Sequence, residues 1–259
     1  MKFIGIIPAR YASTRFPGKP LEDLCGKTVI HRVYEQAAKA LDTVVVATDD
    51  ERIYDAVETF GGKVVMTRTD HRCGTDRCLE AYEAITTPEW REKNNRDTVV
   101  INIQGDEPFV QPGQIESLME CFDNSETQIA TLVRPYTDQD TLADLENPNT
   151  PKVVWSKETG EALLFSRSVI PYMRGVEKSE WPARGQYYRH IGMYAYRADV
   201  LAQITELSPT PLEQAESLEQ LRWLDHGYRI RIGVTETATI GIDTPEDLQK
   251  AVEWYKRNG

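Results

Sequence analysis

The sequence lacks the residue arrangements that mark several common classes of protein. Its four cysteines show no CxxC spacing, and none has a histidine partner at the distance found in zinc fingers. Unpaired thiols are typical of the reducing cytosol. No run of 18 apolar residues occurs, which excludes a membrane-spanning helix, and "FIGII" (3–7) is too short for the apolar core of a signal peptide. We therefore expect a cytoplasmic protein with no membrane partner.

Positive charge is also scarce. The 30 Lys and Arg residues are outnumbered by 41 Asp and Glu residues, which gives a net charge of −11. A nucleic-acid-binding surface neutralises phosphates with Lys and Arg, so this balance argues against a nucleic-acid partner. The exception is the stretch 2–33, which has six Lys and Arg residues against Glu22 and Asp23. Apart from Lys2, its basic side chains follow the first apolar run.

Two well-known phosphate-binding loops are absent from this basic stretch. A Walker A loop requires a glycine five residues before its Gly-Lys pair, but that position holds Ser13 before Gly18-Lys19 and Leu21 before Gly26-Lys27. No GxGxxG motif occurs either. The sequence therefore supports neither a P-loop NTPase nor a dinucleotide-binding enzyme.

Two interpretations of the basic loop remain open. Arg10, Arg15 and Lys19 can hold phosphate oxygens, because Arg offers a planar fork of donors and Lys a compact charge. Alternatively, the loop is solvated and its cations pair with Glu22 and Asp23, as most charge runs do. Local sequence does not decide between the two.

The first half of the chain alternates between strand and helix patterns. Continuous apolar runs at 3–8, 43–50, 63–67 and 97–108 predict buried strands, and helical patterns at 28–41, 51–62 and 76–85 separate them. This alternation predicts an α/β, Rossmann-like, doubly wound fold, with a mainly parallel mixed sheet flanked by helices. Ligands of such sheets bind beyond the carboxyl ends of the strands.

The pattern changes after about residue 130. Residues 129–200 are rich in strand patterns, with Thr159-Gly160 as a hairpin turn, and 173–186 are polar and predict a loop that acts as a lid. A helix over 212–226, a strand over 228–236 and a helix over 246–257 complete the chain. We therefore expect one domain over 1–259, with a nucleotide-binding part (1–128), a smaller β-rich lobe (129–200) and a C-terminal part (201–259).

Two aspartates stand where a metal site is expected. Asp106 follows a buried strand and a glycine, so it is either a ligand of Mg²⁺, which prefers oxygen donors, or a turn residue. In "IDTPEDL", Thr244 predicts a helix N-cap and Pro245 the first helical residue, which leaves Asp243 free at the end of a short strand over 239–242.

Further polar side chains occur in apolar surroundings. At helical spacing, Glu219 falls on the sector formed by Leu212, Ala215, Leu218 and Trp223, so it is either part of a buried salt bridge or a ligand-binding group. In "RHIGMYAYR", positions 190, 192 and 194 share one strand face, which places His190 beside Tyr194.

Nine blocks of the sequence resemble the CMP-sugar-acid synthetases, and most closely those that activate a 3-deoxy-octulosonate. They span residues 3 to about 250, in order, at compatible spacing: "PARYASTRFPGKPL", "VATDDERI", "GGKVVMTRTDHRCGTDR", "VINIQGDEP", "NPNTPKVV", "LLFSRSVIP", "RHIGMYAYR", "PLEQAESLEQLR" and "GIDTPEDL". The resemblance implies a cytidylyltransferase with CTP and a 3-deoxy-octulosonate sugar acid as its substrates, Mg²⁺ as its cofactor and a homodimer formed through the β-rich lobe.

The resemblance also implies roles for individual residues. The residues matching CTP contacts are Pro8, Ala9, Arg10, Arg15, Lys19, Gly74, Thr75, Arg77 and Gln104; the metal ligands are Asp106 and Asp243; the sugar-acid contacts are Arg167, His190, Tyr194, Glu219 and Gln220. Lys19, Arg10, Asp106 and Asp243 form the implied catalytic group, with Mg²⁺ between the basic loop and the two carboxylates. Cys73 stands where the resemblance leads us to expect serine.

Two alternatives stay open at this stage. The same chemistry could serve a related sugar acid, such as an 8-amino derivative or a nonulosonate, with a different pocket. A catalytically silent protein that binds a nucleotide sugar belongs to a different class, and it would not need both metal carboxylates.

Overall fold

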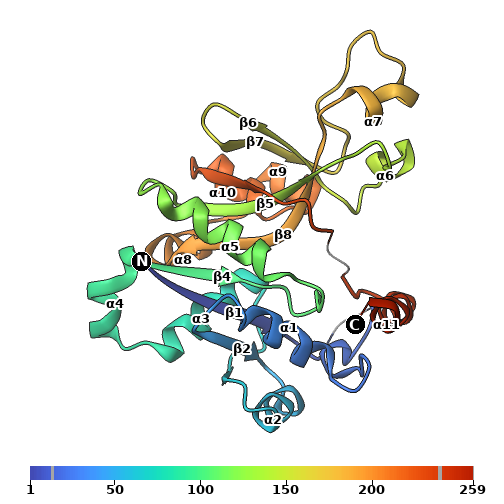
Figure 1. The fold of residues 1–259 in the computed structure, drawn as a ribbon. Helices are drawn as coiled ribbons and strands as arrows, with labels where there is room; N and C mark the ends of the chain where they lie inside the picture. The colour runs from blue at the N-terminus through green and yellow to red at the C-terminus, as the bar shows by residue number, and fades with distance from the viewer. Residues whose placement is uncertain (13–14, 239–240, 259) are drawn as a thin grey trace. The chain divides into compact units, whose positions relative to one another are not determined.

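The structure is a computed structural model that describes residues 1–12, 15–238 and 241–258 (Figure 1). The chain forms two compact units. Unit 1 comprises residues 1–116, 195–205 and 239–259, and unit 2 comprises 117–194 and 206–238. Each unit combines stretches far apart in the sequence. This division differs from the three consecutive parts expected from the sequence, whose separate roles stay a prediction.

Unit 1 contains the predicted alternation of strands and helices. In chain order its elements are β1 (Lys2–Ala9), η1 (Lys19–Leu21), α1 (Val29–Ala37), β2 (Val44–Thr48), α2 (Glu51–Thr59), β3 (Val64–Met66), α3 (Gly74–Ile85), α4 (Pro88–Asn94), η2 (Asn95–Asp97), β4 (Thr98–Asn102), the start of α5 (Pro112–Glu120), α8 (Ala198–Thr205) and α11 (Pro245–Asn258). The strand order is β3-β2-β1-β4, and all three pairings are parallel.

The strand order of unit 1 explains where its ligand site lies. From β1 the chain proceeds outward to β2 and β3, then returns to place β4 on the other side of β1. Such a reversal leaves a crevice beyond the carboxyl ends of the two central strands. Both strands are buried: all five residues of β4 are, as are Ile4 to Ile7 of β1. The loops after Ala9 and Asn102 therefore start from fixed positions at one edge of the sheet.

Helix ends in unit 1 follow the sequence signals closely. The hydroxyl of Thr28 accepts a hydrogen bond from the N–H of His31 at the start of α1. Thr244 caps α11 in the same way, since its hydroxyl accepts from the N–H of Asp247 at 3.2 Å. The Asp247 carboxylate in turn accepts from the N–H of Thr244, which completes a reciprocal cap. The predicted N-cap is confirmed; part of the short strand expected over 239–242 lies outside the described residues.

Unit 2 is richer in strands. It contains the end of α5, η3 (Cys121–Asp123), β5 (Ile129–Pro135), α6 (Leu142–Glu146), β6 (Lys152–Ser156), β7 (Glu161–Ser166), η4 (Lys178–Glu180), α7 (Trp181–Arg184), most of β8 (Tyr188–Arg197), α9 (Pro211–Glu216), α10 (Gln220–Asp225) and β9 (Ile230–Val234). Strands β5 and β9 pair in parallel. Strand β7 pairs antiparallel with both β6 and β9. The predicted α/β class with a mixed sheet is thus confirmed.

The prediction of a hairpin in unit 2 is confirmed, whereas the prediction for the polar segment over 173–186 is only partly correct. Gly160 has φ +72° and closes the predicted turn between β6 and β7. Residues 173–186 are not structureless, because they contain η4 and α7. Trp181 of α7 is 2% exposed and packs beside Tyr187 and Tyr136. The loop prediction for this segment is therefore wrong in part, and its action as a lid stays a prediction.

The single helix predicted over 212–226 is wrong. The chain forms α9, then turns at Ser217, which has φ +50°, and continues as α10. One left-handed residue changes the direction of the chain, so the side chains of the two helices do not share one stripe. Leu212 is consequently 43% exposed, whereas Leu221 is fully buried.

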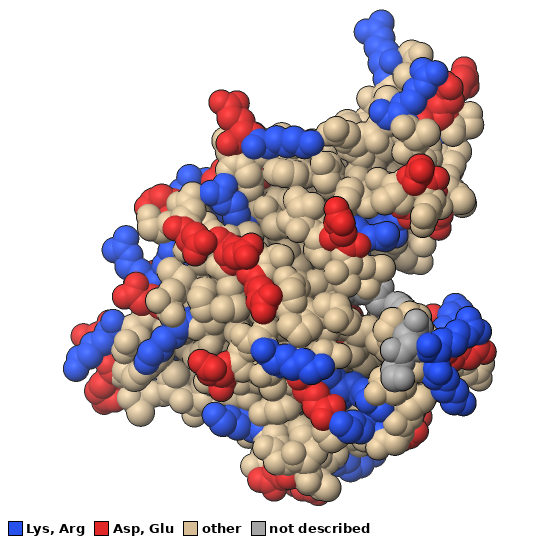
Figure 2. All heavy atoms as spheres, viewed as in Figure 1, with Lys and Arg blue, Asp and Glu red and all other residues tan. Residues whose placement is uncertain are grey.

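Two further observations concern the surface. In the described part of the chain, no helix is both long enough and apolar enough to cross a membrane. On the face drawn in Figure 2, Lys and Arg side chains alternate with Asp and Glu side chains.

Candidate functional site

A pocket in unit 1 gathers most of the residues predicted to bind nucleotide. Its cavity has a volume of about 240 Å³ and lies at the carboxyl ends of β1 and β4. The residues lining it are Pro8, Ala9, Arg10, Arg15, Lys19, Pro20, His71, Cys73, Gly74, Arg77, Gln104, Gly105, Asp106 and Asp243. Of the predicted CTP contacts, Thr75 alone is missing from this lining, and its side chain is buried in α3.

The basic loop after β1 supplies one side of this pocket. The N–H of Gly18 donates to the carbonyl of Tyr11 at 3.0 Å, which closes the loop, and Ser13 and Thr14 within it lie outside the described residues. Gly18 has φ +76°, and a Cβ there would lie 3.1 Å from the Tyr11 ring. Glycine is thus required on both grounds. Lys19, the next residue, begins η1 and is only 9% exposed.

The Tyr11 ring is itself held in place. The guanidinium carbon of Arg52 lies 3.3 Å from its centroid, and Asp50 binds Arg52 through two hydrogen bonds of 2.9 and 2.7 Å. Cations over aromatic rings are attracted to the electron-rich face. The basic loop is therefore fastened to the start of α2, a contact that the sequence did not indicate.

Lys19 lies between the two predicted metal carboxylates. Its Nζ donates to Asp106 at 2.6 Å and to Asp243 at 3.2 Å, and Arg15 pairs with Asp243 at 3.2 Å. The sequence-based interpretation held that these acids do not neutralise the basic loop because a metal separates them. In the structure the cation and the carboxylates are in direct contact, and the placement of a metal between them stays a prediction. The competing pairing with Glu22 and Asp23 is not found among the described ion pairs of Arg15 and Lys19.

Backbone contacts fix the two carboxylates next to each other. Gly105 packs so closely on β1 that a Cβ there would lie 2.8 Å from the carbonyl oxygen of Pro8. The carbonyl of Asp106 accepts from the N–H of Ile242 at 2.9 Å, and Ile242 is fully buried with Leu24. Asp243 follows Ile242 directly, so its side chain is placed beside that of Asp106.

Glu107 is a residue that the sequence analysis did not select. Burial, followed by the charges of Asp106 and Asp243, raises its pKa to about 7. Its Oε2 is buried and has no hydrogen-bond partner among the residues that the structure describes. The position of this acid between Gly105-Asp106 and Pro108 was a signal that could have identified it.

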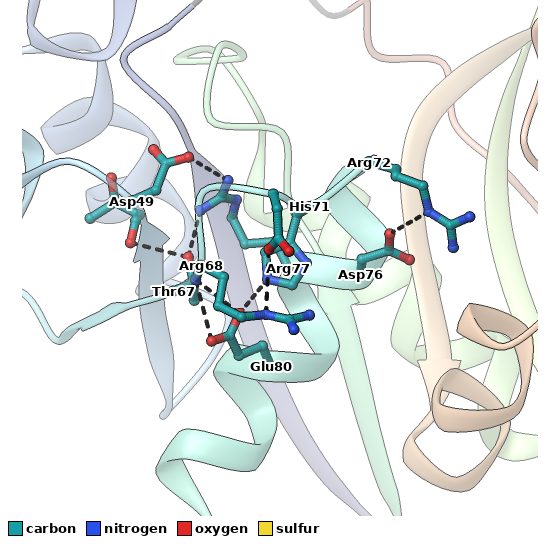
Figure 3. A network of polar contacts seen from close by, with 10 residues as sticks. Asp49, Thr67, Arg68, His71, Arg72, Asp76, Arg77 and Glu80 are labelled. Atoms are coloured by element: carbon teal, nitrogen blue, oxygen red, sulfur yellow. Dashed lines mark hydrogen bonds and ion pairs between the residues drawn. The ribbon is translucent and has the colours of Figure 1, made fainter.

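The α3 side of the pocket is built from a second polar network (Figure 3). Arg77 lies on α3 and is 4% exposed; it donates to Asp49 at 2.7 Å and also binds Thr67. Asp49 follows β2 and Thr67 follows β3, so one guanidinium joins two strand ends to the helix. Arg77 is therefore held rigidly in the pocket wall. Cys73, at the position where serine was expected, is the N-cap residue of α3, and its side chain makes no capping hydrogen bond.

The predicted sugar-acid residues lie in unit 2. His190 and Tyr194 of β8 have ring centroids 5.3 Å apart, and Tyr194 packs edge-on against Trp223 of α10 at 5.1 Å. Trp223 is the additional residue here that sequence reasoning did not assign to the site. The pKa of the Tyr194 phenol is raised well above its usual value by burial and by the charge of Glu219, so it remains protonated. The structure thus brings His190, Tyr194 and Glu219 together.

His190 does not supply positive charge for a sugar carboxylate. Burial lowers its pKa to about 3, so the imidazole is neutral near pH 7. Its Nε2 lies 3.0 Å from the hydroxyl of Thr131, which donates to the carbonyl of Met193. The ring therefore donates Nε2–H to Thr131 and keeps Nδ1 as an acceptor. His190 offers hydrogen bonding, not positive charge.

Arg167 is the remaining candidate cation, and its donors are already engaged. Its Nε donates to the carbonyl of Glu216 at 2.6 Å, and its other nitrogens donate to the carbonyls of Pro148 and Ser217. Its backbone N–H also binds the Glu216 carboxylate at 2.9 Å. Arg167 thereby holds the turn between α9 and α10, which positions Glu219 and Gln220. Gln220 is 4% exposed, and its amide nitrogen has no partner in the described part of the structure.

The donor set at Asp106 and Asp243 fits a magnesium ion. Within the described residues, no group of three or more His, Cys, Asp and Glu side chains could by itself hold a metal. Mg²⁺ does not need such a cage, because it is usually bound by one or two carboxylates, waters and substrate phosphates. Both aspartates already reach one ammonium group from two sides. The chemistry of the site therefore agrees with the metal expected from the sequence.

Comparison with known proteins places this site within a family. The α/β fold and a pocket that combines cations with paired carboxylates define the class as nucleotidyltransferases. The cytidylyltransferase family model matches residues 4–231. The 3-deoxy-manno-octulosonate cytidylyltransferase of Parabacteroides distasonis is 59% identical over 253 residues and 97% of both chains, and that of Bacteroides thetaiotaomicron is 58% identical over 256 residues and 99% of both.

A solved structure gives the same result. The structure of a CMP:2-keto-3-deoxy-manno-octonic acid synthetase complexed with CTP has a TM-score of 0.87 and 40% identity, and each chain is covered completely. The chain belongs to the cytidylyltransferase family, in its branch of 3-deoxy-manno-octulosonate cytidylyltransferases.

Proposed function

We propose that the protein transfers CMP from CTP to the anomeric hydroxyl of 3-deoxy-D-manno-octulosonate, and releases pyrophosphate. The nucleotide sugar formed serves lipopolysaccharide synthesis. The observation that carries this proposal is the pocket of unit 1, where Lys19 and Arg15 meet Asp106 and Asp243 at the carboxyl edge of the sheet. The similarity over the full length to a synthetase complexed with CTP supports the choice of nucleotide.

The basic loop binds the triphosphate in this proposal. Arg10 and Arg15 are exposed at the pocket, whereas Lys19 is buried at its base. Charge-assisted hydrogen bonds to phosphate are about twice as strong as neutral ones. When the triphosphate enters, its oxygens take over the donors that now bind the two aspartates. Lys19 contributes most, because it is buried at the base of the pocket, where water screens its charge least.

The two carboxylates are the proposed ligands of Mg²⁺. Asp106 and Asp243 lose their partner when Lys19 turns to the phosphates, and these two carboxylates would then hold the ion. The bound ion supplies neutralisation of the triphosphate and polarisation of its oxygens. Gly105 and Ile242 keep the two side chains together throughout, because both act through the backbone.

The reaction then consists of one displacement at phosphorus. The anomeric oxygen of the sugar acid forms a bond to the α-phosphorus of CTP, the bond from that phosphorus to the bridging oxygen breaks, and the electron pair leaves with pyrophosphate. The hydroxyl proton passes to solvent. The residues of this chain contribute mainly positioning and charge, as in phosphoryl transfer generally.

The cluster in unit 2 binds the sugar acid in this proposal. Tyr194 and the amide of Gln220 donate hydrogen bonds to hydroxyl or carboxyl oxygens, and Glu219 and Nδ1 of His190 accept from hydroxyls. Arg167 acts by holding the turn before Glu219 in place. The substrate carboxylate is bound by neutral donors, since the imidazole is uncharged.

The resemblance to the synthetases also supports two statements about the whole enzyme. It acts in the cytoplasm, where CTP is available, and it forms a homodimer through the strand-rich residues 129–200. Sedimentation of the purified protein at micromolar concentration should give the mass of two 29.5 kDa chains. A single-chain mass across that range would contradict the dimer.

Pyrophosphate release tests the proposed reaction. The purified protein is mixed with CTP and Mg²⁺, and each of a panel of sugar acids is added: 3-deoxy-D-manno-octulosonate, its 8-amino derivative and a nonulosonate. We expect rapid release with the first acid. Release with another acid alone would assign a different substrate, and release with none would indicate a protein that binds nucleotide without catalysis.

A further inference from the structure

Glu80 of α3 connects the helix to the loop in front of it. Its carboxylate accepts two hydrogen bonds from the N–H of Arg68, at 3.1 and 3.3 Å, and pairs with Nε2 of His71 (Figure 3). Partial burial alone would raise the Glu80 pKa, but the Arg68 N–H and His71 outweigh that effect and hold the pKa below its usual value. One ionised side chain thus fixes two points of the loop over 68–73.

His71 is the part of this network that reaches the nucleotide pocket. Its side chain is 4% exposed, yet it lines the cavity together with Cys73, Gly74 and Arg77. The nitrogen of His71 that faces Glu80 is held by the carboxylate, which sets the orientation of the ring. Because the loop starts at Thr67, whose N–H binds the carbonyl of Thr48 at 2.8 Å, its two ends are fixed by the sheet and by α3.

We infer that Glu80 and His71 form a positioning pair for the α3 wall of the nucleotide pocket, which selects the nucleoside rather than the phosphates. This inference rests on the proposed function and identifies the end of CTP that each wall binds. The cations Arg15 and Lys19 lie with the two aspartates, whereas the guanidinium of Arg77 in the α3 wall is already bound by Asp49 and Thr67. Glu80 acts only through His71 and the loop backbone, so it is not a catalytic residue.

The pair makes a distinctive prediction about binding. Calorimetry should show that Glu80→Ala and His71→Asn each weaken CTP binding about tenfold, while binding of inorganic triphosphate changes less than twofold. The double variant should bind CTP no more weakly than either single variant, because the two side chains form one unit. Glu80→Gln keeps an acceptor oxygen and should stay within about threefold of the original protein.

Glu83→Ala is the matched control, since this exposed acid lies on the same helix, one turn further on. It should leave both affinities unchanged. A parallel loss of triphosphate and CTP binding, additive effects in the double variant, or no effect on CTP would each overturn the inference. If Glu80→Ala does not fold, His71→Asn decides, because it leaves the hydrogen bonds of Arg68 intact. Failure of the original protein to bind CTP would instead contradict the proposed function.

Discussion

The two candidate binding regions use opposite chemistry. In unit 1, four charged side chains meet at the pocket and neutralise one another: Arg15, Lys19, Asp106 and Asp243. In unit 2, His190 and Tyr194 are kept uncharged by burial, and aromatic rings surround them. Charged partners can be exchanged for ligand charges, whereas a neutral aromatic cluster selects by shape and hydrogen bonding.

This difference suits the two proposed substrates. A nucleoside triphosphate carries several negative charges, and its binding requires cations that can leave their present partners. A sugar acid carries one negative charge and many hydroxyls, so its recognition depends on donors and acceptors at fixed positions. Each of the following predictions either removes or measures one side of this contrast.

The largest effect is expected from Asp106→Asn. The substitution preserves shape but removes the charge that now binds Lys19 and that we propose binds Mg²⁺. Pyrophosphate release in the presence of Mg²⁺ should fall by about a thousandfold, in the range that loss of a strong electrostatic group produces. Asp42→Asn, at an exposed position before β2, serves as a control. Near-normal turnover of Asp106→Asn would remove this carboxylate from the mechanism.

Lys19→Ala should follow, with turnover reduced about a hundredfold, and Arg15→Ala should cost about tenfold. The order follows from burial: Lys19 is 9% exposed and contacts both carboxylates, whereas Arg15 is exposed and contacts one. Single-turnover pyrophosphate release at saturating CTP separates the two. An equal loss of turnover in both variants would show that the burial of a cation does not determine how much it contributes to turnover.

Tyr194→Phe addresses the neutral cluster alone. The KM for the sugar acid should rise about tenfold, because a buried partner group is left without its hydrogen bond, while the KM for CTP stays constant. Tyr172→Phe, at a residue of unit 2 that is 74% exposed, should alter neither constant. A rise in the KM for CTP in the Tyr194 variant would mean that the two regions are not chemically separate.

The smallest effect concerns acid stability and His190. In the unfolded chain this imidazole takes up a proton below about pH 6.5, but in the folded protein it does so only at about pH 3. Folding stability contributed by His190 is therefore intact above pH 6.5 and declines as the pH falls from 6.5 to 3, by up to about 1.4 kcal/mol per pH unit. Urea unfolding from pH 7 to 5 should show this slope. His190→Gln should flatten it, and an unchanged slope would count against neutral burial.

The sequence predicted unit 1 more completely than unit 2. Buried parallel strands give long apolar runs, and capping residues such as Thr244 act on neighbours in the chain, so both leave local signals. The arrangement around Lys19 leaves no such signal, because its partners lie 87 and 224 positions away. The choice of residues at the pocket was therefore predictable, but the direct ion pairs were not.

In unit 2 the main error came from one residue. Helical spacing over 212–226 assumes a continuous helix, but the chain turns at Ser217, which is in the left-handed region. Glycine is the usual residue at such a position, so no residue here signalled the helix end. Glu219 was consequently assigned to a stripe that does not exist. The neutral state of His190 could not be predicted from the sequence either, because it depends on burial beside Tyr194 and Phe165 and not on local sequence.

The position of Lys19 has a consequence for the release of products. Because Asp106 and Asp243 bind its ammonium group in the structure, we expect them to compete with pyrophosphate for this cation in the proposed reaction. Affinity for triphosphate is thereby limited, but so is inhibition by the product. A lysine without these partners would bind CTP more tightly, and pyrophosphate would dissociate from it more slowly. In the proposed mechanism, turnover thus benefits because Lys19 is paired either with phosphate oxygens or with the two carboxylates.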